Sequence, residues 1–590
     1  MPSGPRVAYL SMEIALEPEI PTYSGGLGVL AGDTIRSAAD LGLDFTAVSL
    51  LHRRGFFRQS LGERGEQIEA PDPWRPEDRL EPMAPRVSIE IESRKVEIRA
   101  WRYSVLGQEG ATVPVYLLDT DLPENHPDDR HLTDDLYLGD MRHRLRQEVV
   151  LGVGGLELLE ALGERPFDRF HLNEGHAALA PLALVERFLA QPSERPSAQP
   201  SQSPSQPPSE QPSELPSEAL ALAEALRLTR ALCVFTTHTP VPAGHDRFPL
   251  ELARSVLGDR RVEILGDLGL TSELNMTELA LVTSRYVNGV AIRHGEVSRS
   301  LFPGYPIRSI TNGVHARTWV SPAMHDLFDR HIPAWPNDPF ALRYAGRIPT
   351  GQIAEAHRRS KEALLDRVRA LTGRSLDPDA LTLGFARRAT GYKRTALVFR
   401  DLERLEVIAS RHGPMQIVFA GKAHPRDEEG KDSIRQVFAA AESLRGRIEV
   451  VYLADYDMDL GQLLVSGSDV WLNNPIPPLE ASGTSGMKAA LNGVPSLSIL
   501  DGWWVEGCVE GVTGWEIEDG VVEDPREPHA RDAHHADALL RKLDEQVAPL
   551  FFGDPERFLD IRRQSIALNG SFFNTHRMLL QYLYEAYLSG

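Results

Sequence analysis

The chain has 590 residues, of which 42% are hydrophobic, and carries a formal net charge of −21. This length favours two or more domains, and the negative charge argues against nucleic acid and anionic membrane surfaces as partners. An anionic ligand must therefore meet a local group of cations. The two cysteines, Cys233 and Cys508, have no metal-type spacing, so we expect a reducing compartment and no zinc site.

The first residues, MPSGPRVAYLSMEIA, contain no positively charged leader ahead of a long apolar run. Nowhere in the chain do 18 apolar residues follow one another. We therefore expect a cytoplasmic protein that does not enter a membrane.

Short apolar runs typical of strands alternate with amphipathic runs typical of helices. In chain order they include RVAYLSM, GGLGVLAGDTIRSAADLG and LDFTAVSLL, and later ALTLGFAR, MQIVFAG and RIEVVYL. Such alternation predicts βαβ units and mostly parallel sheets. Two series occur, from residue 6 to about 313 and from about 380 to 501. We therefore predict an α/β fold with two Rossmann-like domains facing a central cleft.

Two segments interrupt this pattern. VSIEIESRKVEIRAWRYSV alternates apolar and polar residues around Ser93 and Arg94, which predicts an inserted β-hairpin. Residues 191–218 hold eight prolines among serine, glutamine and glutamate. That composition cannot bury enough apolar surface to offset the entropy of ordering, so we predict a disordered surface loop inside the first domain.

A glycine-rich segment, YSGGLGVLAGD, starts at Tyr23 between a predicted strand and a predicted helix. Backbone N–H groups in such a turn, together with the helix N-terminus, suit a phosphate or a sugar oxygen. Many α/β folds need glycines in this turn for steric reasons alone. The sequence leaves both interpretations open.

The segment RRATGYKR, from Arg387 to Arg394, holds four cations and no acid. It follows a predicted strand, LTLGFA, and precedes a predicted helix, TALVFRDLERL. The carboxyl end of a parallel strand is where open α/β sheets bind ligands. A solvated basic surface run is the alternative, but the strand-to-helix position and the interleaved Tyr392 favour a phosphate site.

A third segment, PLEASGTSGMKAALNG, carries Glu480 and, just inside a predicted helix, Lys488. Apolar neighbours would desolvate this lysine, lower its pKa and favour a Schiff base with an aldehyde. In isolation, a lysine that reaches solvent from the start of a helix is the better explanation of the pattern.

Histidines follow two further predicted strands, in HLNEGHA and in FTTHTPVPAGHD. They suit hydrogen bonds to sugar hydroxyls better than a metal, because no HExxH or close His/Cys array occurs. His529, His534 and His535 lie in a polar stretch that we expect to be a loop. We predict no metal centre.

Taken together, YSGGLGVLAGD, HLNEGHAAL, VFTTHTPVPAGHDRF, ITNGVH, GFARRATGYKR, GKAHP, WLNNPIPPLEASGTSGMKAALNG and LDGWW occur in this order between residues 23 and 504. This series resembles the glycogen/α-glucan phosphorylase family, in its short bacterial form. The resemblance implies the two-domain glycosyltransferase architecture called GT-B. EASGTSGMK is the most specific segment.

The resemblance implies roles for individual residues. Lys488 would hold pyridoxal 5′-phosphate covalently, as an internal aldimine. The cations Arg387, Arg388 and Lys393 would surround the cofactor phosphate and the substrate phosphate. The remaining implied contacts are Thr484, Ser485, Tyr456 and Trp319 for the cofactor, Gly25, Gly26 and Leu27 for the substrate phosphate, and His238, Asn312, Glu480, Ser482 and Gly483 for the glucosyl unit.

The resemblance also implies the reaction, the phosphorolysis of the non-reducing terminal unit of an α-1,4-glucan with retention. In the family, the 5′-phosphate of the cofactor relays a proton to the attacking phosphate. The implied partners are α-1,4-glucan and inorganic phosphate, and the expected assembly is a homodimer. Two anionic phosphates side by side explain why the chain needs several fixed cations.

The family also suggests domain boundaries. We place a glucan- and phosphate-binding domain at residues 1–313 and a pyridoxal-phosphate-binding domain at 314–560. A helical segment at 561–590 is expected to pack back on the first domain. The short N-terminus leads us to expect an enzyme without control by nucleotide effectors.

The sequence departs from the family at Gly391, where a larger residue is usual, and at Asp457, where long members carry a basic residue. These departures leave the preferred size of the glucan open. The nearest alternative function is a nucleotide-sugar-dependent glucan synthase of the same fold, and a second is a non-catalytic glucan-binding protein. The synthase would not need EASGTSGMK, and a binding protein would not need Lys488, Arg388, Lys393 and His238 together.

Overall fold

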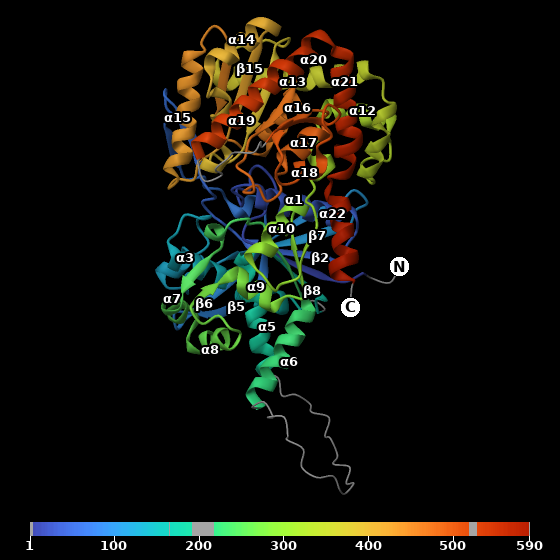
Figure 1. Cartoon of the computed structure of the whole chain (residues 1–590). Helices are drawn as coiled ribbons and strands as arrows, with labels where there is room; N and C mark the ends of the chain where they lie inside the picture. The colour runs from blue at the N-terminus through green and yellow to red at the C-terminus, as the bar shows by residue number, and fades with distance from the viewer. Residues whose placement is uncertain (1–3, 164–165, 191–216, 519–527, 589–590) are drawn as a thin grey trace, which may run out of the picture.

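The computed structural model describes residues 4–163, 166–190, 217–518 and 528–588. It has two lobes, one above the other in Figure 1. The predicted proline-rich insertion lies almost wholly outside the described residues, and its last two positions, Ser217 and Glu218, begin helix α6. No helix in the described part of the chain is both long and apolar enough to cross a membrane.

The first lobe is built on a nine-stranded sheet in the order β13-β12-β9-β8-β1-β2-β7-β6-β5. Neighbours from β13 to β7 are parallel, and β6 and β5 add an antiparallel edge. Numbered along the chain, the parallel strands from β7 to β12 have the order 3-2-1-4-5-6 that is typical of doubly wound sheets. The strands are β1 (Val7–Ser11), β2 (Phe45–Leu50), β5 (Glu81–Ile91), β6 (Arg94–Leu106), β7 (Thr112–Asp119), β8 (Arg169–Asn173), β9 (Cys233–Thr236), β12 (Tyr286–Gly289) and β13 (Ile307–Ser309).

The second lobe contains a six-stranded, fully parallel sheet in the order β16-β15-β14-β17-β18-β19. Numbered along the chain this is again 3-2-1-4-5-6. The strands are β14 (Leu381–Ala386), β15 (Met415–Ala420), β16 (Glu449–Leu453), β17 (Val470–Asn473), β18 (Ser496–Ile499) and β19 (Gly514–Ile517). Two small antiparallel pairs, β3 (Arg58–Leu61) with β4 (Gln67–Ala70) and β10 (Arg247–Pro249) with β11 (Glu273–Asn275), complete the described strands.

Helices connect the strands in both lobes. Those before residue 314 are α1 (Gly26–Asp40), α2 (Pro127–Arg130), α3 (Met141–Val149), α4 (Gly155–Ala161), α5 (Leu179–Ala190), α6 (Ser217–Leu232), α7 (Leu250–Leu257), α8 (Asp259–Asp267), α9 (Met276–Thr283) and α10 (Ile292–Leu301). Those that follow are α11 (Ala316–Trp319), α12 (Pro322–His331), α13 (Thr350–Thr372), α14 (Leu402–His412), α15 (Glu428–Ser443), α16 (Met458–Gly467), α17 (Ser485–Leu491), α18 (Trp504–Gly507), α19 (Pro528–Lys542), α20 (Ala548–Gly553), α21 (Pro555–Gln564) and α22 (Thr575–Tyr582).

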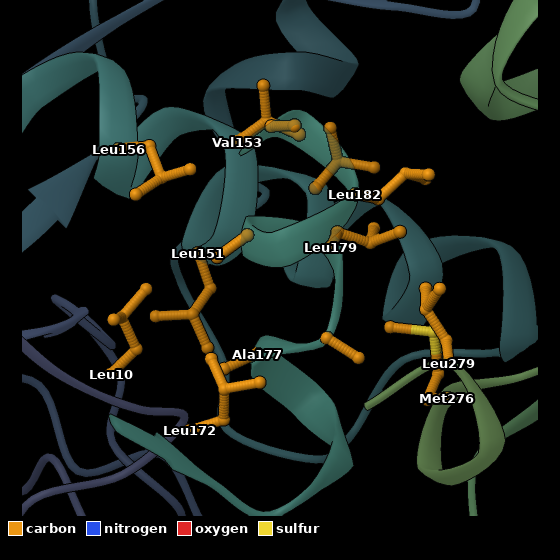
Figure 2. Packing of buried hydrophobic residues seen from close by; sticks show 14 of the residues in the cluster. Leu10, Leu151, Val153, Leu156, Leu172, Ala177, Leu179, Leu182, Met276 and Leu279 are labelled. Carbon is orange, nitrogen blue, oxygen red and sulfur yellow. The ribbon is translucent and has the colours of Figure 1, made fainter. Parts of the chain in front are cut away.

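Helices cover the first sheet, so its central strands are buried along their whole length. Figure 2 shows part of this core, where Leu10 of β1 and Leu172 of β8 face Leu151 and Leu179 of the covering helical segments. All four side chains are fully buried. Burial of a leucine contributes about 1.5–3 kcal/mol, so this layer is a main source of the stability of the lobe.

The predicted hairpin is confirmed as β5 and β6, which turn at Glu92 and Ser93. Both residues have positive φ, 53° and 58°, as expected for the primed turns that suit the twist of a hairpin.

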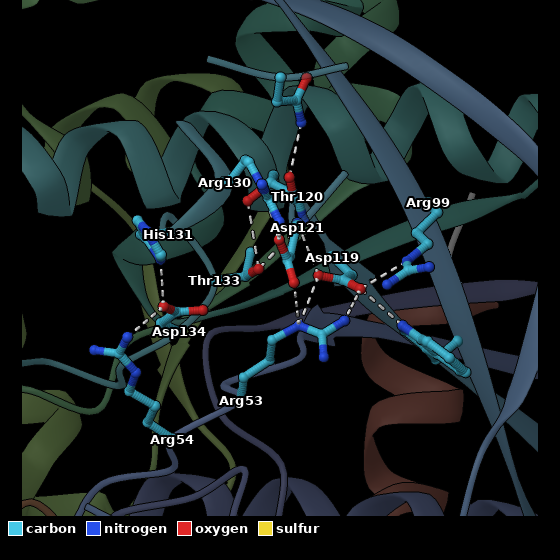
Figure 3. Close-up of polar contacts among 12 residues, drawn as sticks. Arg53, Arg54, Arg99, Asp119, Thr120, Asp121, Arg130, His131, Thr133 and Asp134 are labelled. Atoms are coloured by element: carbon cyan, nitrogen blue, oxygen red, sulfur yellow. Dashed lines mark hydrogen bonds and ion pairs between the residues drawn. The ribbon is translucent and has the colours of Figure 1, made fainter. Parts of the chain in front are cut away.

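Asp119 is the last residue of β7 and pairs with Arg99 of β6. Its buried carboxylate accepts hydrogen bonds from Arg99 at 2.8 Å and from Arg53 at 2.5 Å, which tie the hairpin to the sheet (Figure 3).

The chain passes between the lobes twice, and the two passages lie side by side. Val314 donates its N–H to Phe573 at 3.1 Å and accepts from Thr575 at 3.0 Å. Helix α22 then packs against the first sheet, where Tyr582 and the following residues join Val7 and Tyr9 in one apolar cluster. The last helix therefore belongs to the core of the first lobe, although α21 before it packs with the second.

Replacing Gly313 with alanine is expected to destabilise this double passage. A Cβ at Gly313 would overlap the backbone of Asn574, whereas a Cβ at Gly346 would meet no atom within 4 Å. We expect Gly313→Ala to lower the midpoint of urea unfolding by a shift worth about 1–3 kcal/mol, because backbone cannot yield as a side chain can. Gly346→Ala is the matched control and should leave the midpoint unchanged or raised. Equal midpoints for the two variants would contradict the prediction.

The prediction of a helix directly after the basic segment is wrong. Residues 397–399 form only a short 3-10 turn, and α14 begins at Leu402. The Asp401 carboxylate accepts from the backbone N–H of Arg404 and caps the helix there, and Arg394 has a positive φ of 50°. The basic segment is therefore followed by an irregular connection.

Candidate active site

Glu480 is the centre of a buried charge cluster that joins two of the segments singled out in the sequence. Its Oε2 accepts a 2.6 Å hydrogen bond from Arg387 and another hydrogen bond from the Lys393 ammonium. All three side chains are more than nine-tenths buried. Burial by itself would raise the pKa of Glu480, but the two cations lower it to about 2. The carboxylate is therefore ionised at neutral pH and holds both cations in place.

Lys393 has a pKa that is sensitive to its surroundings. Burial and the neighbouring Arg387 guanidinium lower it to about 7, and Glu480 opposes this shift only in part. A second negative charge beside the ammonium would favour the charged form and raise the pKa. Lys393 can therefore take up a proton when an anion binds next to it.

Two nitrogens of the Arg387 guanidinium are unpaired within the described part of the chain. Its Nη2 binds Glu480, but Nε and Nη1 are buried and have no hydrogen-bond partner among the described residues. Leaving a buried N–H group unpaired costs about 1–3 kcal/mol, and a guanidinium edge matches the geometry of a phosphate. When Lys393 is protonated, the two cations and one carboxylate also leave a net positive charge. The cluster is therefore suited to bind an anion.

The glycine-rich turn approaches the basic segment from the other lobe. Arg388 donates from Nη2 to the Ser24 hydroxyl at 3.0 Å, and a Cβ on Gly25 would lie 2.7 Å from the same nitrogen. The N–H of Gly25 is taken by the Glu13 carboxylate, which also accepts from the N–H of Ser24 at 2.6 Å. Gly26 opens helix α1, whose first N–H groups have no partner within the helix.

Lys488 lies in α17, the short helix that follows the Glu480 turn, and is 7% exposed. Its Nζ lies 3.5 Å from the centre of the Trp319 ring. No carboxylate of the described residues lies within ion-pair distance, and burial lowers the pKa of Lys488 to about 8. Asp33 fixes the indole by accepting from Trp319 Nε1 at 2.8 Å. An amine that loses its proton this readily can react with an aldehyde.

The turn from Glu480 into α17 carries four more of the predicted residues. Gly483 has a φ of +73°, a conformation that glycine adopts without strain, and the Ser482 hydroxyl donates weakly to its carbonyl at 3.4 Å. Thr484 directly precedes α17, and the Ser485 hydroxyl accepts from an indole of β17 at 3.1 Å. These residues share one short stretch of backbone with Lys488.

Tyr456 and Asn312 lie in two other loops. The Tyr456 hydroxyl lies against Gly461 of α16, where a Cβ would approach it to 3.0 Å. Asn312 is 4% exposed, and its Oδ1 has no partner among the described residues. Its carbonyl accepts from Arg577 of α22 at 2.9 Å. Asn312 therefore has a fixed backbone and an unused side-chain acceptor.

His238 is held by residues of its own lobe. Its Nε2 lies 2.7 Å from Oδ1 of Asn173, an atom that can only accept, so this nitrogen carries the proton. Its backbone N–H donates to Glu174 at 2.6 Å. Among the described residues no hydrogen bond joins His238 to the second lobe.

Sequence reasoning missed Glu174 and Glu13, which hold the predicted residues in place. Glu174 has a φ of +74°, a strained conformation for a non-glycine residue, and its carboxylate accepts from three donors between Gly175 and Thr239. Glu13 holds the glycine-rich turn. The signal that could have found them is an acid directly after a predicted strand, as in SMEIA and HLNEG.

The two departures from the family have local structural explanations. Asp457 caps helix α16, because its carboxylate accepts from the backbone N–H of Leu460 at 2.8 Å. Gly391 lies against the Glu429 carboxylate, so a Cβ there would displace the end of that side chain. Neither residue contacts the Glu480 cluster through a hydrogen bond in the described part of the chain.

Two findings concern the remaining histidines. His529, His534 and His535 all lie in helix α19, so the prediction of a loop is wrong. His535 is fully buried, with Nδ1 2.7 Å from Arg394. His315 and His576 each place Nε2 within 3.3 Å of Oδ2 of Asp40. These three residues could hold a metal ion, a grouping that the sequence did not suggest. Hydrogen bonds to Asp40 already account for their arrangement.

The buried histidines are expected to make the protein sensitive to mild acid. Burial lowers the pKa of His171 and His238 to about 3 and that of His52, His294 and His357 to about 4. Between pH 6.5 and 4 the unfolded chain therefore binds more protons than the folded one, so stability is complete above about pH 6.5 and falls below it. Each histidine contributes a loss of up to about 1.4 kcal/mol per pH unit.

Urea unfolding at pH 7.5, 6.5 and 5.5 checks this expectation. Because half of each histidine in the unfolded chain is protonated at pH 6.5, the midpoint should fall slightly between pH 7.5 and 6.5 and much further between pH 6.5 and 5.5. A midpoint that stays constant down to pH 5.5 would contradict it.

Comparison with known proteins identifies the family. A family model described as carbohydrate phosphorylase matches residues 259–516. The maltodextrin phosphorylase of Thermococcus litoralis is 38% identical over 98% of this chain and 70% of its own length. The glycogen phosphorylase of Mycobacterium tuberculosis is 36% identical over 100% of this chain and 71% of its own, and that of Aquifex aeolicus is 33% identical over 98% and 86%. The chain therefore belongs to the carbohydrate phosphorylase family.

Proposed function

We propose that this chain, an α-glucan phosphorylase by its family, uses the Glu480 cluster to bind inorganic phosphate and to transfer the terminal glucosyl unit of an α-1,4-glucan to it. The product would be α-glucose 1-phosphate, formed with retention. The observation that carries the proposal is the pair of buried, unpaired nitrogens on Arg387, beside Lys393 and a single carboxylate. Such a site favours the binding of an anion.

The cations have distinct roles in this proposal. Arg387 offers Nε and Nη1 to a phosphate while Nη2 stays with Glu480. Arg388, already beside the glycine-rich turn, lies at the point where the N–H groups of Gly26 and Leu27 would contribute. Lys393, with its lowered pKa, gains a proton as the anion arrives and so strengthens binding. Together they offset the repulsion between two neighbouring phosphates.

The residues present fit pyridoxal 5′-phosphate. Lys488 offers a buried amine with a lowered pKa, and Trp319 gives it an aromatic face. Thr484 and Ser485 lie on the same turn, and Tyr456 lies in the loop before α16. Because Arg387 has two spare nitrogens, its guanidinium can face the cofactor phosphate as well as the substrate phosphate. When bound, the cofactor would supply a phosphate group that exchanges a proton with the substrate phosphate. Lys488 would serve as its anchor.

The glucosyl unit would lie between the lobes. His238, with its proton fixed on Nε2, and Asn312, with an unused Oδ1, come from the first lobe. Ser482 and Gly483 come from the turn after Glu480 in the second. Water must be kept from the sugar as the glycosidic bond breaks, since water would compete with phosphate. Closure of the two lobes on the glucan would serve this purpose.

We also propose the domain division and assembly that accompany this function. Residues 1–313 form one Rossmann-like domain and residues 314–560 a second, with residues 561–590 returning to the first. The two strand orders and the passage of the chain at Val314 support the first boundary. The chain returns to the first lobe at Asn574, inside the third segment, because α21 still packs with the second lobe. We further propose a cytoplasmic homodimer. Size-exclusion chromatography with light scattering tests the dimer, which a monomer at micromolar concentration would contradict.

Two measurements test the proposed function. Purified protein reduced with borohydride should carry a pyridoxyl group on the peptide that contains Lys488. The same protein should release glucose 1-phosphate from maltodextrin only when phosphate is present. A protein that takes up no pyridoxal phosphate on reconstitution, or that elongates glucan from a nucleotide-glucose donor, would overturn the proposal in favour of the synthase.

A further inference from the structure

The turn at residues 501–503 lies directly behind the Glu480 turn. Asp501 follows β18 and is 3% exposed. Its Oδ2 accepts from the backbone N–H of Glu480 at 2.8 Å, and its Oδ1 accepts from the N–H of Gly502 at 2.9 Å. Trp503 donates its N–H to the carbonyl of Ser482 at 2.8 Å. Two of these hydrogen bonds join the two turns, and the bond from Gly502 orders the 501–503 turn itself.

Steric fit supports the same contact. Gly502 has a φ of +55°, and a Cβ there would overlap the carbonyl oxygen of Ser482. Gly486, in the first turn of α17, faces the Trp503 ring, and a Cβ on it would lie 2.7 Å from the ring. Backbone can come this close only where side chains are absent. The 501–503 turn therefore sets both the position of the Glu480 turn and the start of the helix that carries Lys488.

The surroundings of Asp501 raise the pKa of its carboxyl group. Among the described residues no cation forms an ion pair with it. Burial raises its pKa to about 7, the Glu480 carboxylate adds to this, and the two accepted N–H bonds and Lys393 oppose it. Near neutral pH the group therefore changes between two forms. The carboxylate accepts from both N–H groups, whereas the protonated acid presents a hydroxyl at one of them.

We infer that Asp501 is a positioning residue that holds Glu480, and through it Arg387 and Lys393, where they can bind the substrate phosphate. The inference rests on the proposed function of that cluster. Asp501 touches no reacting atom, and it acts through the backbone of Glu480. When its carboxylate is protonated, the N–H of Glu480 or of Gly502 loses its acceptor, and the turn loosens.

Asp501→Asn tests this inference in the intact, cofactor-loaded enzyme. Asparagine keeps the size but offers only one acceptor oxygen, so the variant should resemble the protonated form at every pH. We expect the KM for phosphate to rise about 10- to 100-fold at pH 8, the range for losing a hydrogen bond to a charged group. The ratio of variant to wild-type KM should shrink towards 1 at pH 6. Taking the ratio cancels the titration of phosphate itself.

A second variant separates the position of the Glu480 turn from the charge of Asp501, and a third serves as control. Gly502→Ala should push the Ser482 carbonyl away and raise the KM for phosphate by a factor that does not depend on pH. Asp401→Asn, at a helix cap of the same lobe, is the control and should behave as wild type. Absorbance of the bound cofactor and the thermal midpoint show that each variant is folded and loaded.

The outcomes distinguish this inference from the proposed function. The inference is overturned if the wild type is active and the KM of Asp501→Asn for phosphate at pH 8 equals that of the wild type. A ratio above 1 that stays constant between pH 6 and pH 8 would also overturn it, because protonation of Asp501 would then not matter. If the wild type itself lacks phosphorolysis and the pyridoxyl adduct, the proposed function has failed first.

Discussion

Replacing Lys488 with alanine is expected to abolish cofactor binding and to lower phosphorolysis by at least about 100- to 1000-fold, the usual cost of losing a group that stabilises developing charge. The amine is 7% exposed, lies against Trp319, and has a pKa lowered to about 8, so it is placed to react and has no structural ion pair to lose. Truncation should therefore cost function far more than stability. Borohydride reduction followed by peptide mapping and a phosphorolysis assay measure the two effects.

The control for this prediction is Lys95→Ala, which removes a lysine whose side chain is 71% exposed. It should retain both the cofactor and the activity. Lys488→Arg adds a second test, because it keeps the positive charge but cannot form the same bond to an aldehyde. Should Lys488→Ala still carry a pyridoxyl group after reduction, another lysine would be the anchor and the assignment would be wrong.

Replacing Arg387 with alanine is expected to reduce kcat/KM for phosphate by about 100- to 1000-fold, the usual cost of removing a donor that faces developing charge. The two unpaired nitrogens of Arg387 would be lost together with its ion pair to Glu480. Because Arg387 lowers the pKa of Lys393, its removal should also raise that pKa. The pH dependence of kcat/KM for phosphate should therefore move to higher pH.

Steady-state kinetics with phosphate varied at fixed maltodextrin, between pH 6 and 9, measures both effects. Arg435→Ala, on the exposed face of α15, is the matched control and should change neither value. An unchanged KM for phosphate in Arg387→Ala would show that the anion binds elsewhere. A large loss of activity with an unchanged pH profile would contradict the proposed coupling to Lys393.

Local sequence patterns predicted much of the fold. Alternating short apolar and amphipathic runs indicated two parallel sheets, and the alternation around Ser93 indicated the hairpin, because both signals depend on neighbouring residues. The helix after the basic segment was placed too early, since its start depends on where the Asp401 carboxylate meets the backbone. His535 was placed in a loop because polar neighbours hid its buried contact with Arg394.

The sequence by itself singled out the residues that we propose carry the chemistry: the cations from Arg387 to Lys393, Glu480, and a lysine among small and apolar neighbours at 488. Only the tertiary structure decided how they are held. Glu480 was a lone acid in sequence, yet it pairs with cations 93 and 87 residues away, and its backbone N–H is bound by Asp501 from the turn after β18. Such partners are chosen by the sheet order, which brings strand ends together whatever their separation along the chain. Burial then sets the pKa values of Lys393, Lys488 and Asp501, and burial is a property of the packed structure alone.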